Sequence, residues 1–214
     1  IIIDDEVSEK SFKILKRIKD LDERIKVIFN KNNLGAGISR NRAIEIAKGD
    51  YLAFCDCDDI WNEKKLSEQI QFMKEHKSDF SYTSYSVINK KGNIIGKRNA
   101  EKEMYFSKLI TSCDIGLSTV VMKKELYDGN FFCFPDIKTK EDYIFWLRLS
   151  EKGIKMNGLN KELSSWRKLD DSLSSSYFQK ISDGFRVYKV YLNYNIFKSL
   201  FYLFILSINF LIKK

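Results

Sequence analysis

Residues 48–59 read KGDYLAFCDCDD, an apolar run that ends in a cluster of carboxylates. A continuous apolar run is typical of a strand that is buried on both faces of a parallel sheet. Such a strand would deliver Asp56, Asp58 and Asp59 together at its carboxyl end. Carboxylates gathered there repel one another and lose hydration, which is costly unless a cation lies among them. Oxygen ligands of this kind suit Mg²⁺ or Mn²⁺, and these ions commonly bridge to phosphates.

Strands and helices alternate along the chain, which predicts an α/β domain with a mostly parallel central sheet and helices on both faces. Ligands bind such sheets outside the carboxyl ends of the strands, where Asp4 and Asp5 also fall. On the third predicted helix, Leu66, Ile70 and Met73 share one face. The predicted strands are 1–3, 25–29, 51–55, 80–88, 94–95 and 116–122, and the predicted helices are 8–21 with Ser8 as its cap, 38–48, one that follows Asn62 and one that begins at Thr139.

The length and composition fit one domain with an appendage. The chain has 214 residues, and its apolar fraction of 44% is enough for a sizeable core. We expect an α/β domain over residues 1–175 and a helical C-terminal extension over residues 176–214. Because the first residue is Ile1 and the first strand is short, we expect the sequence to begin inside the domain.

The charge balance limits the classes of partner. Lys and Arg outnumber Asp and Glu by 37 to 29, which gives a net charge of +8. A basic surface favours nucleotide phosphates, acidic lipid or nucleic acid, although a Lys-rich composition without functional meaning explains the excess equally well. Nucleic acid is the weakest of the three, because the sequence has no Arg-rich stripe and no nucleic-acid-binding motif.

The cysteines and the single histidine do not suit a zinc site or a disulfide framework. The four cysteines lack the paired spacing that either would need, and His76 lies at the polar end of a predicted helix. A reducing, cytosolic setting therefore fits best.

Six short motifs follow one another along the chain at a characteristic spacing. In this order they resemble family 2 glycosyltransferases of the GT-A fold, over roughly residues 1–175. The resemblance implies a Rossmann-like GT-A sheet and transfer of a sugar from a nucleotide diphosphate donor. The motifs are residues 1–5 (IIIDD), 33–35 (NLG) with 40–41 (RN) and 43–44 (AI), 48–51 (KGDY), 56–59 (DCDD), 141–142 (ED), and 166–167 (WR) with 172–174 (SLS).

The resemblance also implies a metal site and a nucleotide site. Asp58, in the DxD motif that Asp56 begins, would ligate Mn²⁺ or Mg²⁺, and Asp56 would contact the ribose or the metal. The alternative is an Asp-rich turn that caps the next helix, which the accompanying motifs disfavour. The resemblance further places one carboxylate of Asp4 and Asp5 on the nucleotide base, Arg40 and Asn41 near the nucleotide, and Arg167 on phosphate. A solvated strand end would explain Asp4 and Asp5 equally well, and an exposed helix face would explain Arg40 and Asn41.

The 141–142 pair resembles the catalytic ED motif of the family. Asp142 would be the general base, and Glu141 would orient the acceptor or the base. The alternative is a capping box, because Thr139 and Asp142 have the [ST]-x-x-[DE] spacing that stabilises a helix start. We favour the base.

The tail predicts a membrane contact. Residues 199–212 carry no charge, yet this run is shorter than the roughly 20 residues of a spanning helix. Lysines flank the run (Lys198, Lys213 and Lys214), so an anchor on an anionic membrane surface fits. A helix that covers the domain's own core fits nearly as well, and the natural chain continuing past Lys214 is a third possibility.

The resemblance, together with these features, implies an inverting glycosyltransferase of bacterial surface polysaccharide synthesis. The donor would be a nucleotide-sugar, with a UDP-sugar favoured, and the acceptor a glycan or a lipid-linked hydroxyl. We expect the protein in the cytoplasm, on the inner face of the cell membrane. Two alternatives stay open: a nucleotidyltransferase, which would need a Gly-rich basic loop that is not visible here, and a membrane-associated assembly protein with a degenerate, non-catalytic GT-A domain.

Overall fold

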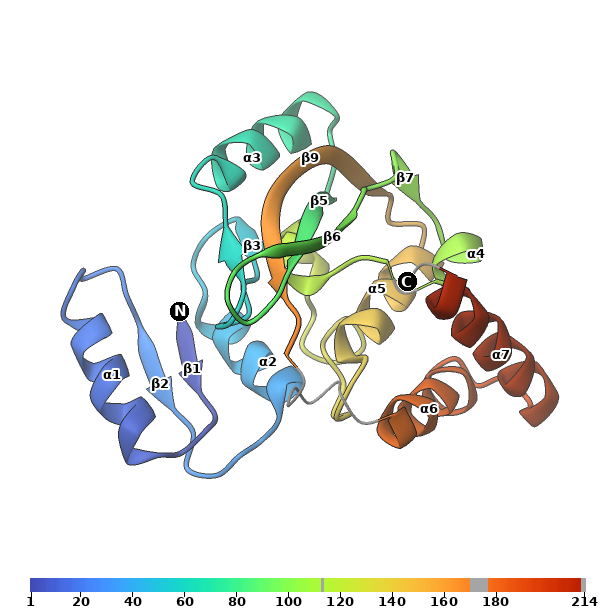
Figure 1. Cartoon of the computed structure of the whole chain (residues 1–214), viewed down its shortest axis with the longest axis horizontal. Helices are drawn as coiled ribbons and strands as arrows, with labels where there is room; N and C mark the ends of the chain where they lie inside the picture. Colours follow the sequence, from blue (N-terminus) through green and yellow to red (C-terminus); the bar gives the residue numbers. More distant parts are fainter. Residues whose placement is uncertain (113, 170–176, 213–214) are drawn as a thin grey trace.

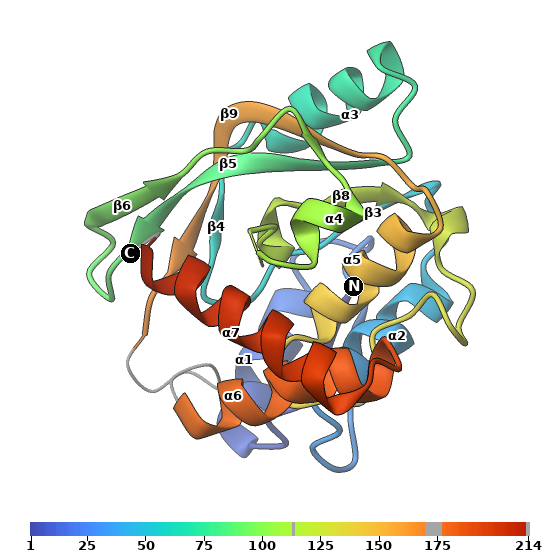
Figure 2. The same ribbon diagram turned by 90° about the vertical axis from the view of Figure 1, so that its right-hand side faces the viewer.

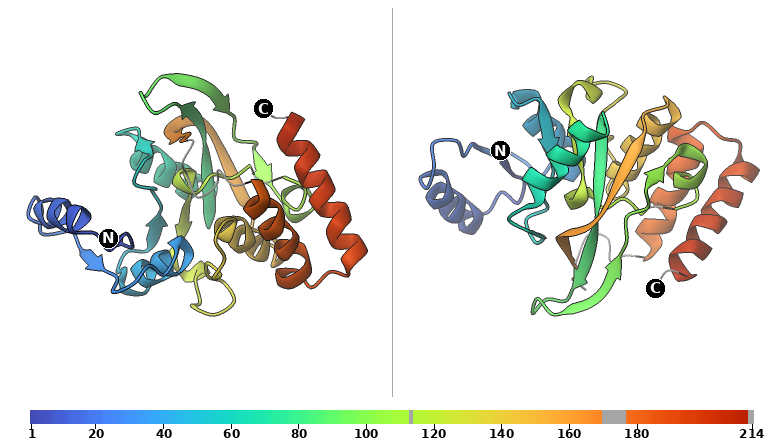
Figure 3. Two further views of the ribbon diagram at one scale, coloured as in Figure 1. Left: turned by 60° about the horizontal axis from the view of Figure 1, so that its bottom comes forward. Right: turned by 90° about the horizontal axis from the view of Figure 1, so that it is seen from above.

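The protein is described by a computed structural model that covers residues 1–112, 114–169 and 177–212. A small unit of β1, α1 and β2 lies at one side, a seven-stranded sheet crosses the middle, and α6 and α7 lie at the other side (Figures 1 and 3). The elements are β1 (Ile2–Asp4), α1 (Glu9–Lys19), β2 (Val27–Phe29), α2 (Ala36–Ile46), β3 (Tyr51–Ala53), β4 (Ile60–Trp61), α3 (Lys65–Glu75), β5 (Phe80–Ile88), β6 (Ile94–Arg98), β7 (Glu103–Met104), α4 (Phe106–Leu109), η1 (Leu117–Thr119), β8 (Val121–Lys123), η2 (Lys124–Leu126), α5 (Glu141–Glu151), β9 (Met156–Arg167), α6 (Tyr177–Arg186), the π-helical turn η4 (Val187–Tyr191) and α7 (Ile196–Ile212).

The central sheet is mixed, with strand order β3-β8-β5-β9-β4, while β6 pairs with β5 and β7 pairs with β9. The long strands β5 and β9 are parallel, and the other described pairings of this sheet are antiparallel. The α/β prediction is confirmed, but the expectation of a mostly parallel sheet is wrong. Residues 116–122, predicted as one strand, divide into η1 and β8. A short 3-10 turn, not a crossover helix, leads into β8, and apolar alternation does not indicate strand direction.

Strands β3, β5 and β9 run in the same direction, although β8 separates β3 from β5. Their carboxyl ends therefore lie at one edge of the sheet. The segments after Ala53 and Ile88 and the end of β9 at Arg167 meet there. This is the edge at which α/β sheets bind ligands.

Helices cover both faces of the central sheet (Figure 2). On one face, α3 packs against β5 and β9, and Gln69 donates from its Nε2 to Ser81 Oγ at 3.0 Å. On the other face, the Trp146 ring of α5 lies 4.9 Å from the Phe80 ring of β5. Neighbouring residues of a strand point to opposite faces, so Phe80 and Ser81 meet different helices.

Helix α5 is the centre of the core. Its side chains from Tyr143 to Leu147, and Leu149, are at most 1% exposed, and a helix that is apolar on all sides is buried on all sides. The same core cluster includes Val187 and Leu206 of the C-terminal elements. The predicted boundary between residues 175 and 176 lies outside the described residues.

Helix α3 buries polar side chains that the apolar pattern did not indicate. Lys65 and Gln69 are fully buried beside Met73, whereas Leu66, predicted to share one face with Met73, is 45% exposed. The buried groups are compensated, because both Lys65 Nζ and Gln69 Nε2 donate to the carbonyl of Thr119, at 3.2 and 2.9 Å. In α1 the predicted cap is confirmed: Ser8 Oγ accepts from the backbone N–H of Ser11 at 3.1 Å.

Gly37 allows α2 to approach the segment before α5. A Cβ at this position would lie 2.7 Å from the carbonyl oxygen of Pro135 and 3.3 Å from Cβ of Glu141. Gly37→Ala should therefore cost about 1–3 kcal/mol of unfolding free energy through overpacking, measured by urea denaturation. Gly49→Ala is the matched control, because its Cβ would meet only the Tyr51 carbonyl at 3.5 Å. Equal stability of the two variants would contradict this close packing.

Candidate active site

Hydrogen bonds from two other segments fix the acidic loop after β3. The backbone N–H of Asp56 donates to Ser118 Oγ at 3.0 Å, and that hydroxyl donates to Asp59 Oδ2 at 2.5 Å. Asp59 Oδ1 accepts from the backbone N–H of Arg167 at 2.9 Å. Burial raises the pKa of Asp59 to about 6, helped by the nearby charges of Asp56 and Asp58 and opposed by these hydrogen bonds. Asp59 thus fastens the loop, which leaves the other two aspartates for other contacts.

Arg40 joins the two acidic motifs that the sequence places about eighty residues apart. Its guanidinium donates to Asp56 Oδ1 at 2.8 Å and to Glu141 Oε1, and it lies 5.6 Å from the centre of the Phe134 ring. Burial alone would lower the pKa of Arg40, but the carboxylates of Asp56 and Glu141 outweigh it and raise that pKa. Arg40 therefore stays charged and holds α2, the acidic loop and the start of α5 together.

Asp142 follows Glu141 in the first turn of α5. Burial raises the pKa of Asp142 well above its usual value; the Glu141 carboxylate adds to this rise, and Arg40 opposes it. Its Oδ1 accepts from the backbone N–H of Tyr143 at 2.7 Å. A carboxyl group with a pKa raised in this way titrates closer to neutral pH, which suits a group that accepts a proton during a reaction.

The described residues offer too few ligands to hold a metal ion by themselves. No group of three or more His, Cys, Asp or Glu side chains in residues 1–112, 114–169 and 177–212 is arranged to hold an ion. Among the same residues, no partner is found for the Asp58 carboxylate, whose backbone carbonyl accepts from Arg167 Nε at 2.8 Å. Asp56 commits one oxygen to Arg40. One or two carboxylates of this kind suit Mg²⁺ or Mn²⁺ when phosphate oxygens complete the coordination.

Asp4 and Asp5 are engaged within the protein. Asp4 is buried, and its Oδ2 accepts from Ser11 Oγ at 2.8 Å. Asp5 accepts from the backbone N–H groups of Leu34 and Gly35, both at 2.8 Å. Asp5 thus stabilises the loop that leads into α2. Both carboxylates lie at the carboxyl end of β1.

Asn41 and Arg167 also bind backbone groups. The Asn41 amide donates to the Phe134 carbonyl at 2.7 Å and accepts from the Phe134 N–H at 3.0 Å. The Arg167 guanidinium donates to the carbonyls of Asp58 and Asn89, at 2.8 and 3.1 Å. Asn41 thus joins α2 to the segment before α5, and Arg167 joins the end of β9 to the acidic loop and to the segment after β5. Residues 172–174 of the last motif lie outside the described residues.

Sequence reasoning missed Asp183, a buried carboxylate of α6 that supports the start of α5. Asp183 Oδ2 accepts from Thr139 Oγ1 at 2.8 Å and from the Thr139 N–H at 3.0 Å. The capping-box alternative for Thr139 is therefore wrong, because its hydroxyl binds α6 and α5 begins at Glu141 after Lys140, whose φ is 69°. The hydrophobic pattern gave no signal for it, because Asp183 lies with Gln179 and Arg186 on the polar side of α6, opposite Ile181 and Phe185. Ser118 was missed as well, because an isolated serine in an apolar run gives no signal either.

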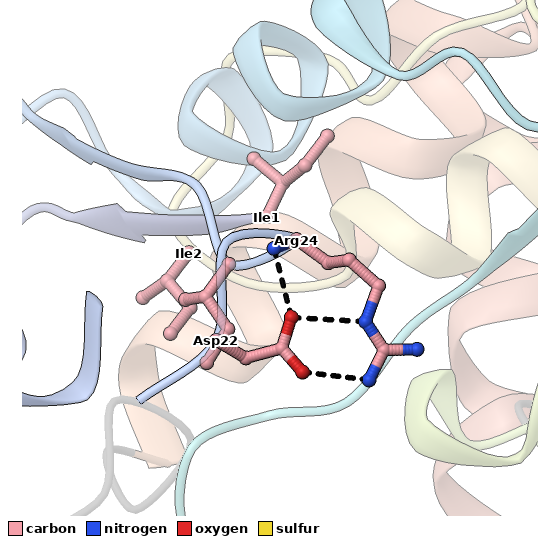
Figure 4. Close-up of a pocket in the computed structure, with 5 residues that line it drawn as sticks. Ile1, Ile2, Asp22 and Arg24 are labelled. Carbon is pink, nitrogen blue, oxygen red and sulfur yellow. Dashed lines mark hydrogen bonds and ion pairs between the residues drawn. The ribbon is translucent and has the colours of Figure 1, made fainter. Parts of the chain in front are cut away.

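A separate hollow lies at the amino end of β1, away from the acidic loop, and is lined by Ile1, Ile2, Asp22, Arg24 and Ile25 (Figure 4). Asp22 has both carboxylate oxygens paired with the Arg24 side chain, at 2.9 and 2.7 Å. The acidic group of this hollow is satisfied by its neighbour, and we assign no function to it.

The family model described as Glycosyl transferase family 2 matches residues 1–136. The chain belongs to this family. TuaG of Bacillus subtilis (strain 168), named for teichuronic acid biosynthesis, is 34% identical over 190 residues, which cover 88% of this chain and 75% of TuaG. WfaP of Escherichia coli is named UDP-Glc:alpha-D-GlcNAc-diphosphoundecaprenol beta-1,3-glucosyltransferase. It is 36% identical over 181 residues, which cover 85% of this chain and 70% of WfaP.

Solved structures confirm the GT-A fold of this family 2 member. Residues 1–349 of S. aureus TarS in complex with UDP-GlcNAc superpose with a TM-score of 0.71 at 21% identity. The alignment covers 94% of this chain and 60% of that chain, so the family 2 domain described here spans less than two thirds of its structural neighbour. Membership of family 2 also removes the basis for the nucleotidyltransferase alternative.

The bond network of Asp183 predicts a graded loss of stability. Asp183→Ala leaves two buried donors of Thr139 without an acceptor, which should cost about 1–3 kcal/mol for each donor in urea unfolding. Asp183→Asn keeps an acceptor oxygen of the same shape and should lose less. Equal losses in the two variants would contradict this prediction, because a neutral acceptor of the same volume would then stabilise the position no better than no acceptor.

Proposed function

We propose that this family 2 glycosyltransferase moves a sugar from a UDP-sugar to an acceptor hydroxyl with inversion at the anomeric carbon. The main support is that the Arg40 guanidinium binds both Asp56 and Glu141. Because Asp142 follows Glu141, this contact brings Asp142 close to the acidic loop after β3. A displacement reaction needs the group that holds the leaving diphosphate and the base that takes the proton of the incoming hydroxyl to lie close together. The site lies at the carboxyl ends of β3 and β9, where the fold binds ligands.

The proposed step is a single displacement. The acceptor oxygen attacks the anomeric carbon from the face opposite the diphosphate, and its proton passes to the Asp142 carboxylate. The bond between the anomeric carbon and the diphosphate oxygen breaks, and its electron pair leaves with the diphosphate. One displacement inverts the configuration, as in inverting glycosidases. Glu141, held by Arg40, orients Asp142 and keeps its basicity high.

Asp58, with Asp56 beside it, is the residue we propose to hold Mn²⁺ or Mg²⁺. When bound, the ion would neutralise charge on the departing diphosphate. Asp58 contributes a half-buried carboxylate for which the described residues offer no competing partner, and Ser118 and Asp59 keep its loop in place. Asp4 and Asp5 lie at the carboxyl end of β1, where we propose that the base of the nucleotide binds, and Arg167 stays a candidate for phosphate contact.

The names of the relatives support the classes of donor and acceptor. WfaP is named for a UDP-sugar and a diphosphoundecaprenol acceptor, and TuaG for teichuronic acid biosynthesis. We extend these classes to this chain: a UDP-sugar donor, a glycan or lipid-linked acceptor, and a place in bacterial surface polysaccharide synthesis. An enzyme that uses a lipid-linked acceptor and a soluble nucleotide-sugar would act in the cytoplasm, at the inner face of the cell membrane.

Calorimetric titration of UDP, with and without Mn²⁺, tests the metal site. Wild-type protein should bind UDP with Mn²⁺, and Asp58→Asn should weaken that binding at least about tenfold, because the substitution removes a metal ligand. Asp50→Asn is the matched control. Asp50 is exposed and precedes β3, at the opposite end of the strand from Asp58, so its loss should leave binding unchanged.

Other results of this titration would separate the parts of the proposal. Binding of GDP or dTDP in place of UDP, with the same metal dependence, would overturn only the choice of donor base. Absence of metal-dependent binding for every nucleoside diphosphate would overturn the catalytic proposal and favour the non-catalytic assembly protein.

The pH dependence of sugar transfer tests Asp142. A general base must be deprotonated, so kcat/KM should rise with pH through the raised pKa of Asp142, above the usual carboxyl range near pH ~4. Glu141→Gln removes a neighbouring negative charge that raises this pKa, so the acid limb should move to lower pH. Glu151→Gln, at the far end of α5, is the control and should leave the limb in place.

The assay follows UDP release from UDP-glucose with a GlcNAc-diphospholipid as acceptor, the pair for which WfaP is named. Asp142→Asn should lower kcat by about 10²–10⁴-fold while UDP still binds. An Asp142→Asn variant that transfers sugar at the wild-type rate, or an acid limb that Glu141→Gln does not move, would exclude Asp142 as the base.

A further inference from the structure

The C-terminal helix α7 has two apolar faces with different surroundings. Ser199 and Leu206 face the protein and are at most 7% exposed. The opposite side lies open to solvent, and Figure 2 shows α7 in front of the molecule and α6 beside it. We call this open side the outer face of α7. It consists of seven large side chains that are 37% to 85% exposed: Phe197, Leu200, Phe201, Phe204, Ile208, Leu211 and Ile212.

The spacing of these residues makes the outer face continuous. At about 100° per residue, all seven fall within an arc of roughly 120°, and the buried Ser199 and Leu206 lie on the other side of the helix. An exposed apolar stripe of this kind marks a contact site on a folded protein, because leaving it in water is unfavourable. The helix is already packed on its inner face, so the contact must be made from outside.

The charged residues of the C-terminal segment have one sign. From Gly184 to the last residue the sequence has no Asp or Glu, but it has Arg186, Lys189, Lys198, Lys213 and Lys214. Lys198 lies on the flank of the outer face, with its Nζ 3.6 Å from the centre of the Tyr194 ring. A second copy of this chain docked face to face would bring like charges together. An anionic lipid surface would instead meet cations at the flank and apolar side chains at the centre.

The length of α7 agrees with a helix that lies along a membrane. It has 17 residues, and the described residues include no helix that is both long and apolar enough to cross a bilayer. On its inner face, Tyr202 of α7 stacks on Tyr188 of η4 in the core, so the helix is not available for insertion across the membrane. Burial of the outer face to the depth of the headgroup region requires no rearrangement of the fold.

We infer that the outer face of α7 docks on the surface of an anionic bilayer. The phenylalanines enter the boundary between headgroups and acyl chains, and the flanking cations bind acidic headgroups. This docking surface is joined to the candidate active site by α6, since α7 packs on α6 and Asp183 of α6 holds Thr139, two residues before Glu141. Where the proposed lipid-linked acceptor is concerned, the inference rests on the proposed function; the docking itself does not.

Flotation with vesicles tests the docking. Wild-type protein should float with mixed phosphatidylcholine and phosphatidylglycerol vesicles, float poorly with pure phosphatidylcholine, and detach at high salt. Phe201→Gln with Phe204→Gln should lower partitioning by about tenfold or more, because two exposed apolar side chains lose their favourable transfer. Leu21→Gln with Ile94→Gln is the control, since these side chains are 78% and 68% exposed but lie outside α7. Circular dichroism checks that each variant is folded.

The outcomes separate this inference from its rivals. Failure of the wild-type protein to float, or equal flotation of the Phe201/Phe204 and control variants, would overturn it. Dimerisation that the Phe201/Phe204 substitutions abolish, without vesicle binding, would assign the face to a second copy. Asp58→Asn should float like the wild type, so loss of nucleotide binding and loss of docking are distinguishable.

Discussion

The site depends on one guanidinium placed between two carboxylates. If Arg40 were absent, three negative charges would lie together where water is partly excluded, on Asp56, Glu141 and the neighbouring Asp142. With it, two of the charges are paired, and the third is left in a setting that raises its pKa. The same pairing draws α2, the loop after β3 and the start of α5 into one edge. Packing at Gly37 and electrostatics at Arg40 therefore depend on each other.

Most charged residues around this edge bind backbone groups, and that is what shapes the site. Asp5 holds the loop before α2, Arg167 binds the carbonyl of Asp58, and Asp183 holds the segment before α5. Each of these side chains stabilises a connecting segment whose backbone groups are not paired within a strand or helix. Asp58 differs because its carboxylate is not used in this way among the described residues. In the sequence, an aspartate that takes part in a reaction cannot be distinguished from an aspartate that stabilises a loop.

The sequence predicts the elements well and their surroundings less well. The bounds of β5 are those of the predicted strand, since aromatic and β-branched residues interleaved with small polar ones, with turn residues after them, are typical of a strand. The burial of Lys65 and Gln69 was not predictable, because the Thr119 carbonyl that compensates them comes from a distant segment. The direction of β8 was not predictable for a similar reason. Alternation of apolar residues indicates a strand, but its direction depends on which strands it pairs with in the fold. The two acidic motifs were visible in the sequence, whereas Arg40 as the link between them required the fold.

The C-terminal helix shows why one apolar run leaves two alternatives open. An apolar run without charges is equally consistent with a core helix and a surface anchor, because composition does not divide a helix into faces. In the structure, Ser199 and Leu206 pack inward while Phe197 and Phe204 face out. A core helix needs only its inner face apolar, so the outer phenylalanines are not explained by folding. They add nothing to the packing of the domain, and the best match for a cation-flanked apolar surface is a partner that is anionic and apolar together. A bilayer has both properties, and it is also the place where a lipid-linked acceptor would present its hydroxyl to the enzyme.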